Sequence, residues 1–186
     1  QALLLPVLGA GRTLISKGFL QAARKHAEQL LSAIRIYDPS GASAIIGVEP
    51  SEIYTLTDEY LDLFPGDPYV GDLSRRAWMV EEFLLRPGLN GLPRAESLKL
   101  APVAPQPKEV LLHGHCYQKA RPPAPDGYPV GMEASAALLR ALGYTVNEID
   151  AGCCGMAGAF GYEREHLDFS QKVGELALLP AVRAAA

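Results

Sequence analysis

The spacing of apolar and polar positions along this chain predicts alternating strands and helices. Four short runs, at positions 2–8, 43–48, 109–115 and 144–150, have the length and composition of strands in a sheet. Between the first two runs, residues 19–34 have helical spacing, because one face collects the apolar side chains Leu20, Ala23, Ala27, Leu30 and Ile34. The chain is therefore expected to begin as a strand followed by a helix.

Further helices are expected between and after these strands. One begins at Pro50 or Ser51 and ends before the PGDP motif at 65–68, and another covers 72–85. A helix at 131–143 ends at a glycine. A last helix starts near Tyr162, and one face of it holds Tyr162, His166, Phe169, Val173 and Leu176. Residues 86–107 are rich in Pro and Gly, which is typical of a connector.

The order of these elements predicts an α/β fold made of parallel-sheet units. Strand, helix, strand and helix in succession imply parallel pairing with a right-handed crossover. A weak internal repeat relates residues 7–25 to residues 151–169, so that the GAG turn at 9–11 aligns with the CCG turn at 153–155. We therefore expect two pseudo-repeated halves, at 1–93 and 94–186, with the CCG turn at the carboxyl end of a strand.

Composition excludes several classes of protein. The 186 residues are 48% apolar, which is enough for a proper core, and the net charge of −4 provides no basic surface for nucleic acid. No apolar run approaches the roughly 20 residues of a membrane span. The sequence starts with Gln and stops at the end of a helical pattern, so we expect a fragment of a larger protein.

The three cysteines are the candidate chemistry. Their odd number argues against a disulfide framework, and a bond between the adjacent Cys153 and Cys154 would distort the chain, so free thiols or metal-bound thiolates are expected. Cys116 follows one predicted strand and the pair follows the next. Ligands of parallel sheets lie beyond the carboxyl ends of the strands, so the three thiols are expected to converge in one crevice, beside the N-terminus of the helix near Tyr162. The alternative is that the cysteines are small apolar core residues.

Other polar residues near these motifs allow more than one interpretation. His113 and His115 flank Cys116 and either bind a metal, donate to sulfur or cap the turn. Thiol chemistry at Cys116 with His115 as the base is a weaker alternative. Glu49 and Glu52 are either hard ligands of a remnant site or carboxylates at a helix N-terminus.

Two motifs resemble a known family. The stretches LHGHCYQKA (112–120) and DAGCCGMAGAFGYE (150–163) resemble the second half of the cysteine-rich CCG domain. That domain occurs in heterodisulfide reductase subunits and in FAD-linked 2-hydroxyacid oxidoreductases of the glycolate and D-lactate type. GRTLISKGFL and GVEPS resemble its first half. The resemblance implies that Cys116, Cys153 and Cys154 bind a 4Fe-4S cluster. The first half carries GAGR and Glu52 in place of thiols, so no cluster is expected there.

The resemblance also implies a function. It suggests the non-catalytic, iron–sulfur electron-transfer module of a flavin-dependent oxidoreductase that acts on a small 2-hydroxy acid. FAD is expected in the parent protein and not in this chain, and the partners would be a flavin domain or subunit and an electron acceptor. A cytoplasmic location is expected, with a peripheral position on the inner face of the membrane as a variant. The alternatives are that zinc replaces the cluster, or that the cluster is absent and the chain is a docking domain without redox activity.

Overall fold

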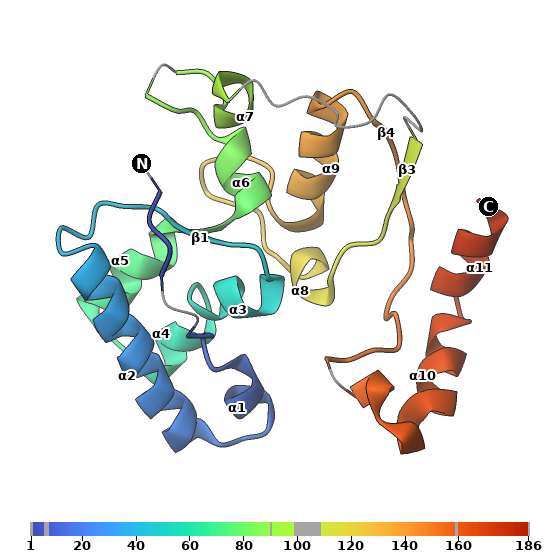
Figure 1. Ribbon diagram of the computed structural model, residues 1–186, viewed down its shortest axis with the longest axis horizontal. Helices are drawn as coiled ribbons and strands as arrows, with labels where there is room; N and C mark the ends of the chain where they lie inside the picture. The colour runs from blue at the N-terminus through green and yellow to red at the C-terminus, as the bar shows by residue number, and fades with distance from the viewer. Residues whose placement is uncertain (1, 6–7, 90, 99–108, 159, 186) are drawn as a thin grey trace. The chain divides into compact units, whose positions relative to one another are not determined.

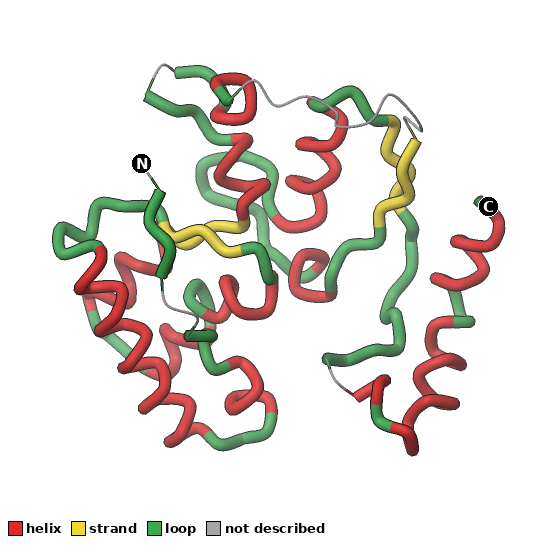
Figure 2. Tube along the Cα trace, in the orientation of Figure 1, coloured by secondary structure: helices red, strands yellow, loops and turns green. Residues whose placement is uncertain are grey.

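The computed structural model describes residues 2–5, 8–89, 91–98, 109–158 and 160–185. The chain divides into two compact units, Gln1–Phe83 and Leu84–Ala186, whereas the sequence repeat placed the division between residues 93 and 94. The described part of each unit contains one two-stranded parallel sheet accompanied by helices (Figures 1 and 2). The predicted fold class, α/β with parallel-sheet units, is confirmed.

The first unit begins with two helices and then forms its sheet. Strands β1 and β2 pair in parallel, with Ile46 opposite Trp78, and short helices connect them. The helix α6 starts in this unit and crosses into the second. The elements are α1 (Arg12–Ser16), α2 (Leu20–Tyr37), β1 (Ile45–Gly47), α3 (Pro50–Thr55), α4 (Glu59–Leu63), α5 (Pro68–Arg76), β2 (Ala77–Met79) and α6 (Val80–Leu85).

The helix α2 confirms the prediction from apolar spacing. Its buried side chains are the predicted ones with Leu31 added and Leu20 left exposed, and they comprise Ala23, Ala27, Leu30, Leu31 and Ile34. Full burial of a leucine or isoleucine side chain contributes about 1.5–3 kcal/mol, so this stripe supplies a large part of the core of the first unit.

The helix predicted at 72–85 is wrong in its middle. The strand β2 interrupts it, and α5 and α6 flank that strand. Ala77 and Met79 are almost fully buried beside β1. The apolar spacing that suggested one helix comes from two short helices on either side of a buried strand. The strand has three residues, which are too few to show the alternation typical of a strand.

The strand predicted at 2–8 is also wrong where the structure describes it. Residues 2–5 and 8 form no strand, and residues 6–7 lie outside the described residues. Leu3 and Leu4 are 63% and 91% exposed, so the apolar run is not buried. The described partner of β1 is β2, whose sequence had suggested a helix.

The second unit contains the predicted strand–helix–strand motif. Strands β3 and β4 pair in parallel from Glu109 opposite Thr145 to Leu112 opposite Glu148, as predicted, and α9 packs on β4 and on α8. Within the expected connector lies α7, and residues 99–107 are outside the described part. The elements are α7 (Arg94–Ser97), β3 (Glu109–Leu112), α8 (Cys116–Lys119), α9 (Gly131–Ala141), β4 (Thr145–Glu148), η1 (Phe160–Tyr162), η2 (Arg164–His166), α10 (Leu167–Gly174) and α11 (Leu178–Ala184).

The last predicted helix starts later and faces another way. Two 3-10 turns, η1 and η2, precede α10, which begins at Leu167 and not near Tyr162. Three members of the predicted apolar face are exposed, namely Tyr162 (83%), Phe169 (61%) and Leu176 (82%). The buried residues of α10 are Ser170 and Gly174, whose small size permits another segment to approach closely.

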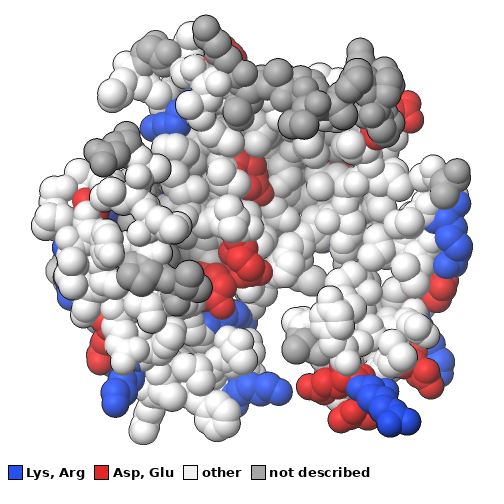
Figure 3. Space-filling model, in the orientation of Figure 1, with Lys and Arg blue, Asp and Glu red and all other residues white. Residues whose placement is uncertain are grey.

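The surface carries charges of both signs. Figure 3 shows acidic and basic side chains scattered over the visible face, with white areas between them. In the part of the chain that the structure describes, no helix has the length and apolar character needed to cross a bilayer.

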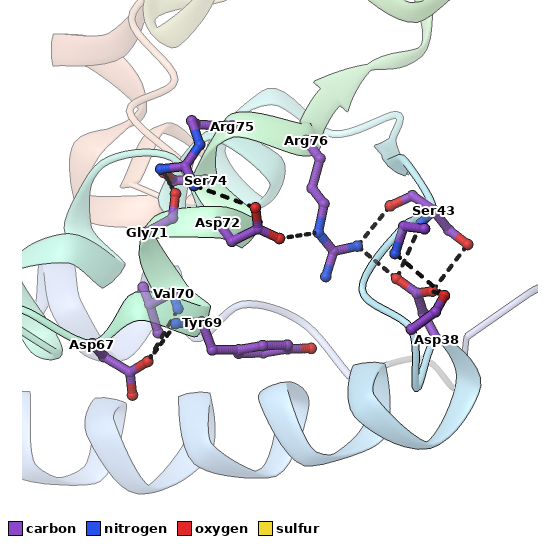
Figure 4. A network of polar contacts seen from close by, with 12 residues as sticks. Asp38, Ser43, Asp67, Tyr69, Val70, Gly71, Asp72, Ser74, Arg75 and Arg76 are labelled. Atoms are coloured by element: carbon purple, nitrogen blue, oxygen red, sulfur yellow. Dashed lines mark hydrogen bonds and ion pairs between the residues drawn. The ribbon is translucent and has the colours of Figure 1, made fainter.

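A largely buried ion pair, Asp38 and Arg76, joins the end of α5 to the segment after α2 (Figure 4). The Asp38 carboxylate, just after α2, accepts a hydrogen bond of 2.7 Å from Arg76 Nη1 at the end of α5. It also accepts from the amide and hydroxyl of Ser43, and Arg76 Nε reaches Asp72 at 3.1 Å. Burial by itself would raise the pKa of Asp38. The hydrogen bonds from Ser43 and Ser40 and the charge of Arg76 outweigh it, so the pKa is lowered.

Candidate functional site

Two loops leave neighbouring ends of the second sheet. After β3, residues 113–115 form the HGH turn, and Cys116 is the first residue of α8. After β4, the chain enters the CCG loop, here residues 151–155. The amide of Ile149 donates to the carbonyl of Leu112 at 2.9 Å, which extends the contact between the strands toward both loops. The structure therefore places the three cysteines beyond the carboxyl ends of two adjacent parallel strands.

The HGH turn is fixed by a close approach and by a cap. A side chain on Gly114 would come within 2.6 Å of Met132 Sδ on α9, so only glycine fits there. His115 caps α8, because its Nδ1 accepts from the amide of Tyr117 at 3.2 Å. The Gln118 side chain in turn accepts from the amide of His115 at 3.0 Å. The interpretation of His115 as a cap of the turn is confirmed.

Lys119 connects the two loops. It lies on α8, three positions after Cys116, and its ammonium group donates to the carbonyl oxygens of Ala151 and, at 3.0 Å, of Gly152. Its third partner is His113 Nε2, at 2.8 Å. A lysine ammonium has three donors, and these three acceptors use all of them. The residues just before Cys153 are thus bound to the helix that begins with Cys116.

His113 is a neutral acceptor in this arrangement. Burial lowers its pKa first, the charge of Lys119 lowers it further, and the carbonyls of Ala151 and Gly152 partly oppose this. A contact with the lysine ammonium at Nε2 assigns the ring proton to Nδ1. The Nε2 atom of His113 is therefore engaged by Lys119 and is a poor candidate for a metal ligand.

The CCG loop turns tightly around Cys153. The amide of Gly155 donates to Cys153 Sγ at 3.3 Å, which is the kind of contact that stabilises a thiolate. Gly155 has a φ of 92°, and a side chain there would come within 2.2 Å of the carbonyl oxygen of Ser170. Ala157 follows with a φ of 43°, a left-handed conformation that costs energy for a residue with a Cβ. The loop shape depends on these strained and glycine-specific positions.

The loop lies against the later part of α10. Ser170 is within contact of both Gly155 and Gly161, and a side chain on Gly174 would meet the carbonyl oxygen of Cys154 at 3.2 Å. The predicted placement of the cysteine pair beside a helix N-terminus near Tyr162 is wrong, because no α-helix begins there. A cation, the Lys119 ammonium, contacts the backbone of the loop just before Cys153.

The three thiols are free, as expected from the cysteine count. Cys116 and Cys153 are exposed and Cys154 is half-buried. Among residues 2–5, 8–89, 91–98, 109–158 and 160–185, no three His, Cys, Asp or Glu side chains are close enough together to hold a metal ion. Thiolates are the ligands that zinc and iron–sulfur clusters prefer, so the donor types fit such a group.

The corresponding turn of the first unit is filled by protein groups. At residues 9–11, the Glu52 carboxylate accepts from the amide of Ala10, and Tyr60 donates its hydroxyl to the Ala10 carbonyl at 3.0 Å. His26 Nε2 contacts the Gly9 carbonyl at 2.7 Å. Burial, with a smaller contribution from Glu52, raises the pKa of Tyr60, which remains a proton donor. Glu49 caps α3 by accepting from the amide of Glu52 at 2.7 Å, as one of its two interpretations predicted.

Sequence reasoning missed the residues that hold these turns. Lys119 lies inside the stretch LHGHCYQKA, but the sequence assigned it no role, and its only signal is its position one helical turn after Cys116. Ser170 and Gly174 have no hydrophobic signal, and the contact of Glu52 with Ala10 joins positions 42 residues apart.

Curated proteins that are similar to this chain are dehydrogenases or parts of them. The chain is 26% identical over 165 residues to one subunit of the anaerobic glycerol-3-phosphate dehydrogenase of Escherichia coli (strain K12), covering 88% of this chain and 37% of that protein. It is 28% identical over 179 residues to the D-2-hydroxyglutarate dehydrogenase of the same strain, covering 95% and 15%. For the D-2-hydroxyglutarate dehydrogenase of Haemophilus influenzae the identity is 25% over 175 residues, covering 92% and 16%.

These similarities extend over most of the chain but over a minor part of each relative. The chain spans about 37% of the glycerol-3-phosphate dehydrogenase subunit and about 15% of the D-2-hydroxyglutarate dehydrogenase from E. coli. No family model and no solved structure matches it. What the comparisons establish is a relation between this chain and parts of dehydrogenases.

Proposed function

We propose that this chain is the iron–sulfur electron-transfer module of a larger flavin-dependent oxidoreductase that acts on a small 2-hydroxy acid. In this proposal Cys116, Cys153 and Cys154 are the protein ligands of a 4Fe-4S cluster. The cluster, when bound, supplies one-electron chemistry. The chain itself is then the non-catalytic part of the enzyme.

The observation that carries the proposal is the position of the two cysteine loops. Parallel pairing of β3 and β4 places Cys116 and the cysteine pair on loops that leave adjacent strand ends, and Lys119 joins those loops. Exposed or half-buried thiols in glycine-specific loops are unlike structural cysteines, which are usually buried in an apolar core. The backbone amide donated to Cys153 Sγ is suited to a thiolate.

The proposed substrate and partners come from the relatives and from the motifs. One relative is named for the 2-hydroxy acid D-2-hydroxyglutarate, and another is a subunit of a dehydrogenase. The CCG-type motifs imply an FAD-containing domain or subunit as the electron donor and a separate acceptor. We place the complex in the cytoplasm, with a peripheral position on the inner face of the membrane as a variant that the same chemistry allows.

A docking domain stabilised by zinc, or free of metal, is the second candidate. The separation of potential ligands favours the metal-free form, since no three of them among the described residues are close enough for a metal. In that case the thiols would have no redox role. Zinc would use the same three sulfurs, with a histidine or water as the fourth ligand. Water fits that position better than either flanking histidine, because Lys119 engages His113 Nε2 and the Tyr117 amide engages His115 Nδ1.

Anaerobic purification and reconstitution with iron and sulfide separate the two candidates. We expect broad visible absorbance that dithionite bleaches, with about four iron and four sulfide per chain for a cubane cluster. Cys154→Ser is expected to lose most of this absorbance. Zinc at about one per chain, or iron uptake that Cys154→Ser leaves unchanged, would contradict the cluster.

A variant with an additional thiol tests whether iron binds to thiols non-specifically. Ser74 belongs to the first unit and the three cysteines belong to the second, so Ser74→Cys adds a thiol outside the proposed ligand set. Its iron content should equal that of the wild type. An increase in Ser74→Cys would show that the iron is bound non-specifically by thiols.

A further inference from the structure

The three acceptors of Lys119 give this residue a role that its sequence does not suggest. We propose that Lys119 is a positioning residue that holds Cys116 and the CCG loop at a fixed separation. Its value for binding a cluster rests on the proposed function.

The helix α8 is a rigid platform for both Cys116 and Lys119. It is a single turn, closed by the amide of Ala120 donating to the carbonyl of Cys116 at 3.0 Å. The capping box at His115 fixes its start, and Gln118 Nε2 donates to Ser135 Oγ of α9 at 2.9 Å. A displacement of the Lys119 backbone therefore also displaces Cys116.

The CCG loop is held at two points that flank its cysteines. Before Cys153, the carbonyls of Ala151 and Gly152 accept from Lys119. After Cys154, Gly155 packs against the backbone of Ser170 on α10. Gly152 has no atom near its missing side chain, whereas the Ala151 side chain is buried, so packing restrains only the Ala151 part of the first point. Lys119 donates to both carbonyls there, and the His113 ring also interacts with them.

The chemistry of the contact favours lysine. Its ammonium has three donors arranged around one centre, and they reach two successive carbonyls and an imidazole nitrogen. An arginine has a planar fork and reaches such a set less well. An apolar side chain of the same length would fill the space without holding either carbonyl.

A cross-linking experiment tests the position of the loops without any metal. In a Cys154→Ser background the remaining thiols are Cys116 and Cys153. A bis-maleimide whose span matches the separation of these thiols bridges them efficiently only when the two loops are held at that separation. We expect Lys119→Met to lower the bridged fraction severalfold and Lys119→Arg to restore part of it. Lys172→Met, a change of an exposed lysine in the same unit, should leave it unchanged. Alkylation by monobromobimane checks that each thiol still reacts.

Metal affinity provides the second measurement. Titration of the apo protein with Co²⁺, followed by the thiolate charge-transfer absorbance, should show about tenfold weaker binding in Lys119→Met, which is typical for loss of an outer-shell contact. Bridging that is equal in Lys119→Met and the wild type would overturn the positioning role, even if metal binds. Bridging that depends on Lys119 in a protein that binds neither iron nor cobalt would support it and reject the proposed function. If Lys119→Met fails to fold by circular dichroism, Lys119→Gln takes its place.

Discussion

The Glu52 carboxylate accepts a hydrogen bond from the amide of Ala10, across 42 positions of sequence. This contact fills the GAG turn at the place where the motif comparison predicts missing thiols. A side chain on Gly9 would lie 3.0 Å from Glu52 Oε2, so the carboxylate also occupies the space beside the first glycine. The first unit closes this turn with its own groups.

Removal of that carboxylate should destabilise the first unit. Glu52→Ala leaves the Ala10 amide without its acceptor, and the expected loss is about 1–3 kcal/mol in the free energy of unfolding. Urea unfolding followed by the fluorescence of Trp78, the only tryptophan, reports on this unit. Glu28→Ala, at an exposed position of α2, is the control and should change stability by less than about 0.5 kcal/mol. Equal effects of the two substitutions would contradict the role of Glu52.

Glycine at position 155 should be necessary for the CCG loop. Gly155→Ala places a methyl group 2.2 Å from the Ser170 carbonyl in a left-handed backbone, so the loop or α10 must shift. We expect a loss of about 2 kcal/mol or more in stability and faster hydrogen exchange at residues 153–155. Gly152→Ala is the matched control, since its methyl group would meet no atom within 4 Å. Similar exchange rates in both variants would show that the packing on Ser170 does not hold the loop.

The Asp38–Arg76 pair should make the stability of the first unit depend on pH. The pKa of Asp38 in the folded protein is lower than its ordinary value of about 3.9. The stabilisation that its ionised carboxylate contributes is therefore fully present above about pH 4. It is lost as the pH falls through the lowered pKa, where the folded carboxylate takes up a proton. Asp38→Asn should therefore be less stable than the wild type by about 2 kcal/mol at pH 7, and the difference should shrink in acid.

Trp78 fluorescence measured in urea across a series of pH values checks this dependence. Asp72→Asn is the comparison, because Asp72 is half-exposed and also bonds Arg76. Its effect should stay below about 1 kcal/mol. A difference between Asp38→Asn and the wild type that stays constant down to pH 2 would show that the Asp38 charge is not what matters.

The hydrogen bond from Tyr54 to the buried carboxylate of Glu82 should contribute to the stability of the first unit. The Tyr54 hydroxyl donates to Glu82 Oε1 at 2.7 Å, and the amide of Met79 donates to its other oxygen at 3.0 Å. Tyr54→Phe removes one donor from a fully buried group, so a loss of about 2–3 kcal/mol is expected by urea unfolding. Tyr162→Phe, at an exposed tyrosine, should be neutral. A neutral Tyr54→Phe would show that the carboxylate is satisfied without it.

The sequence was most informative where signals are local. The helix α2 was predicted from its repeated apolar face, and β3, α9 and β4 were predicted from apolar runs and a glycine stop. These elements imply the position of the cysteine loops, because parallel strands carry their loops on one edge. The position of the two loops follows from the order of the strands, and the cysteines within them were identified from their sequence motifs.

The sequence was least informative where contacts are long-range or side chains are small. The strand β2 has three residues and lies between two helices, so its spacing looked helical. The buried face of α10 consists of Ser170 and Gly174, which contribute no hydrophobic period. Lys119 reaches a carbonyl 32 positions away, a distance over which local patterns carry no information.

Ser170 contacts two glycines, Gly155 and Gly161, and restricts substitution at these two positions in different ways. A methyl group at 155 would strike the backbone oxygen of Ser170, so no exchange at 170 can make room for it. A methyl group at 161 would strike mainly the hydroxyl oxygen of Ser170 and the Met156 residue. Across descendants of this sequence, position 155 is therefore expected to stay glycine whatever occupies 170. Position 161 is expected to accept alanine only in lineages where 170 has already become alanine or glycine and where the Met156 backbone, whose Cα would lie 3.0 Å from the methyl group, has also shifted.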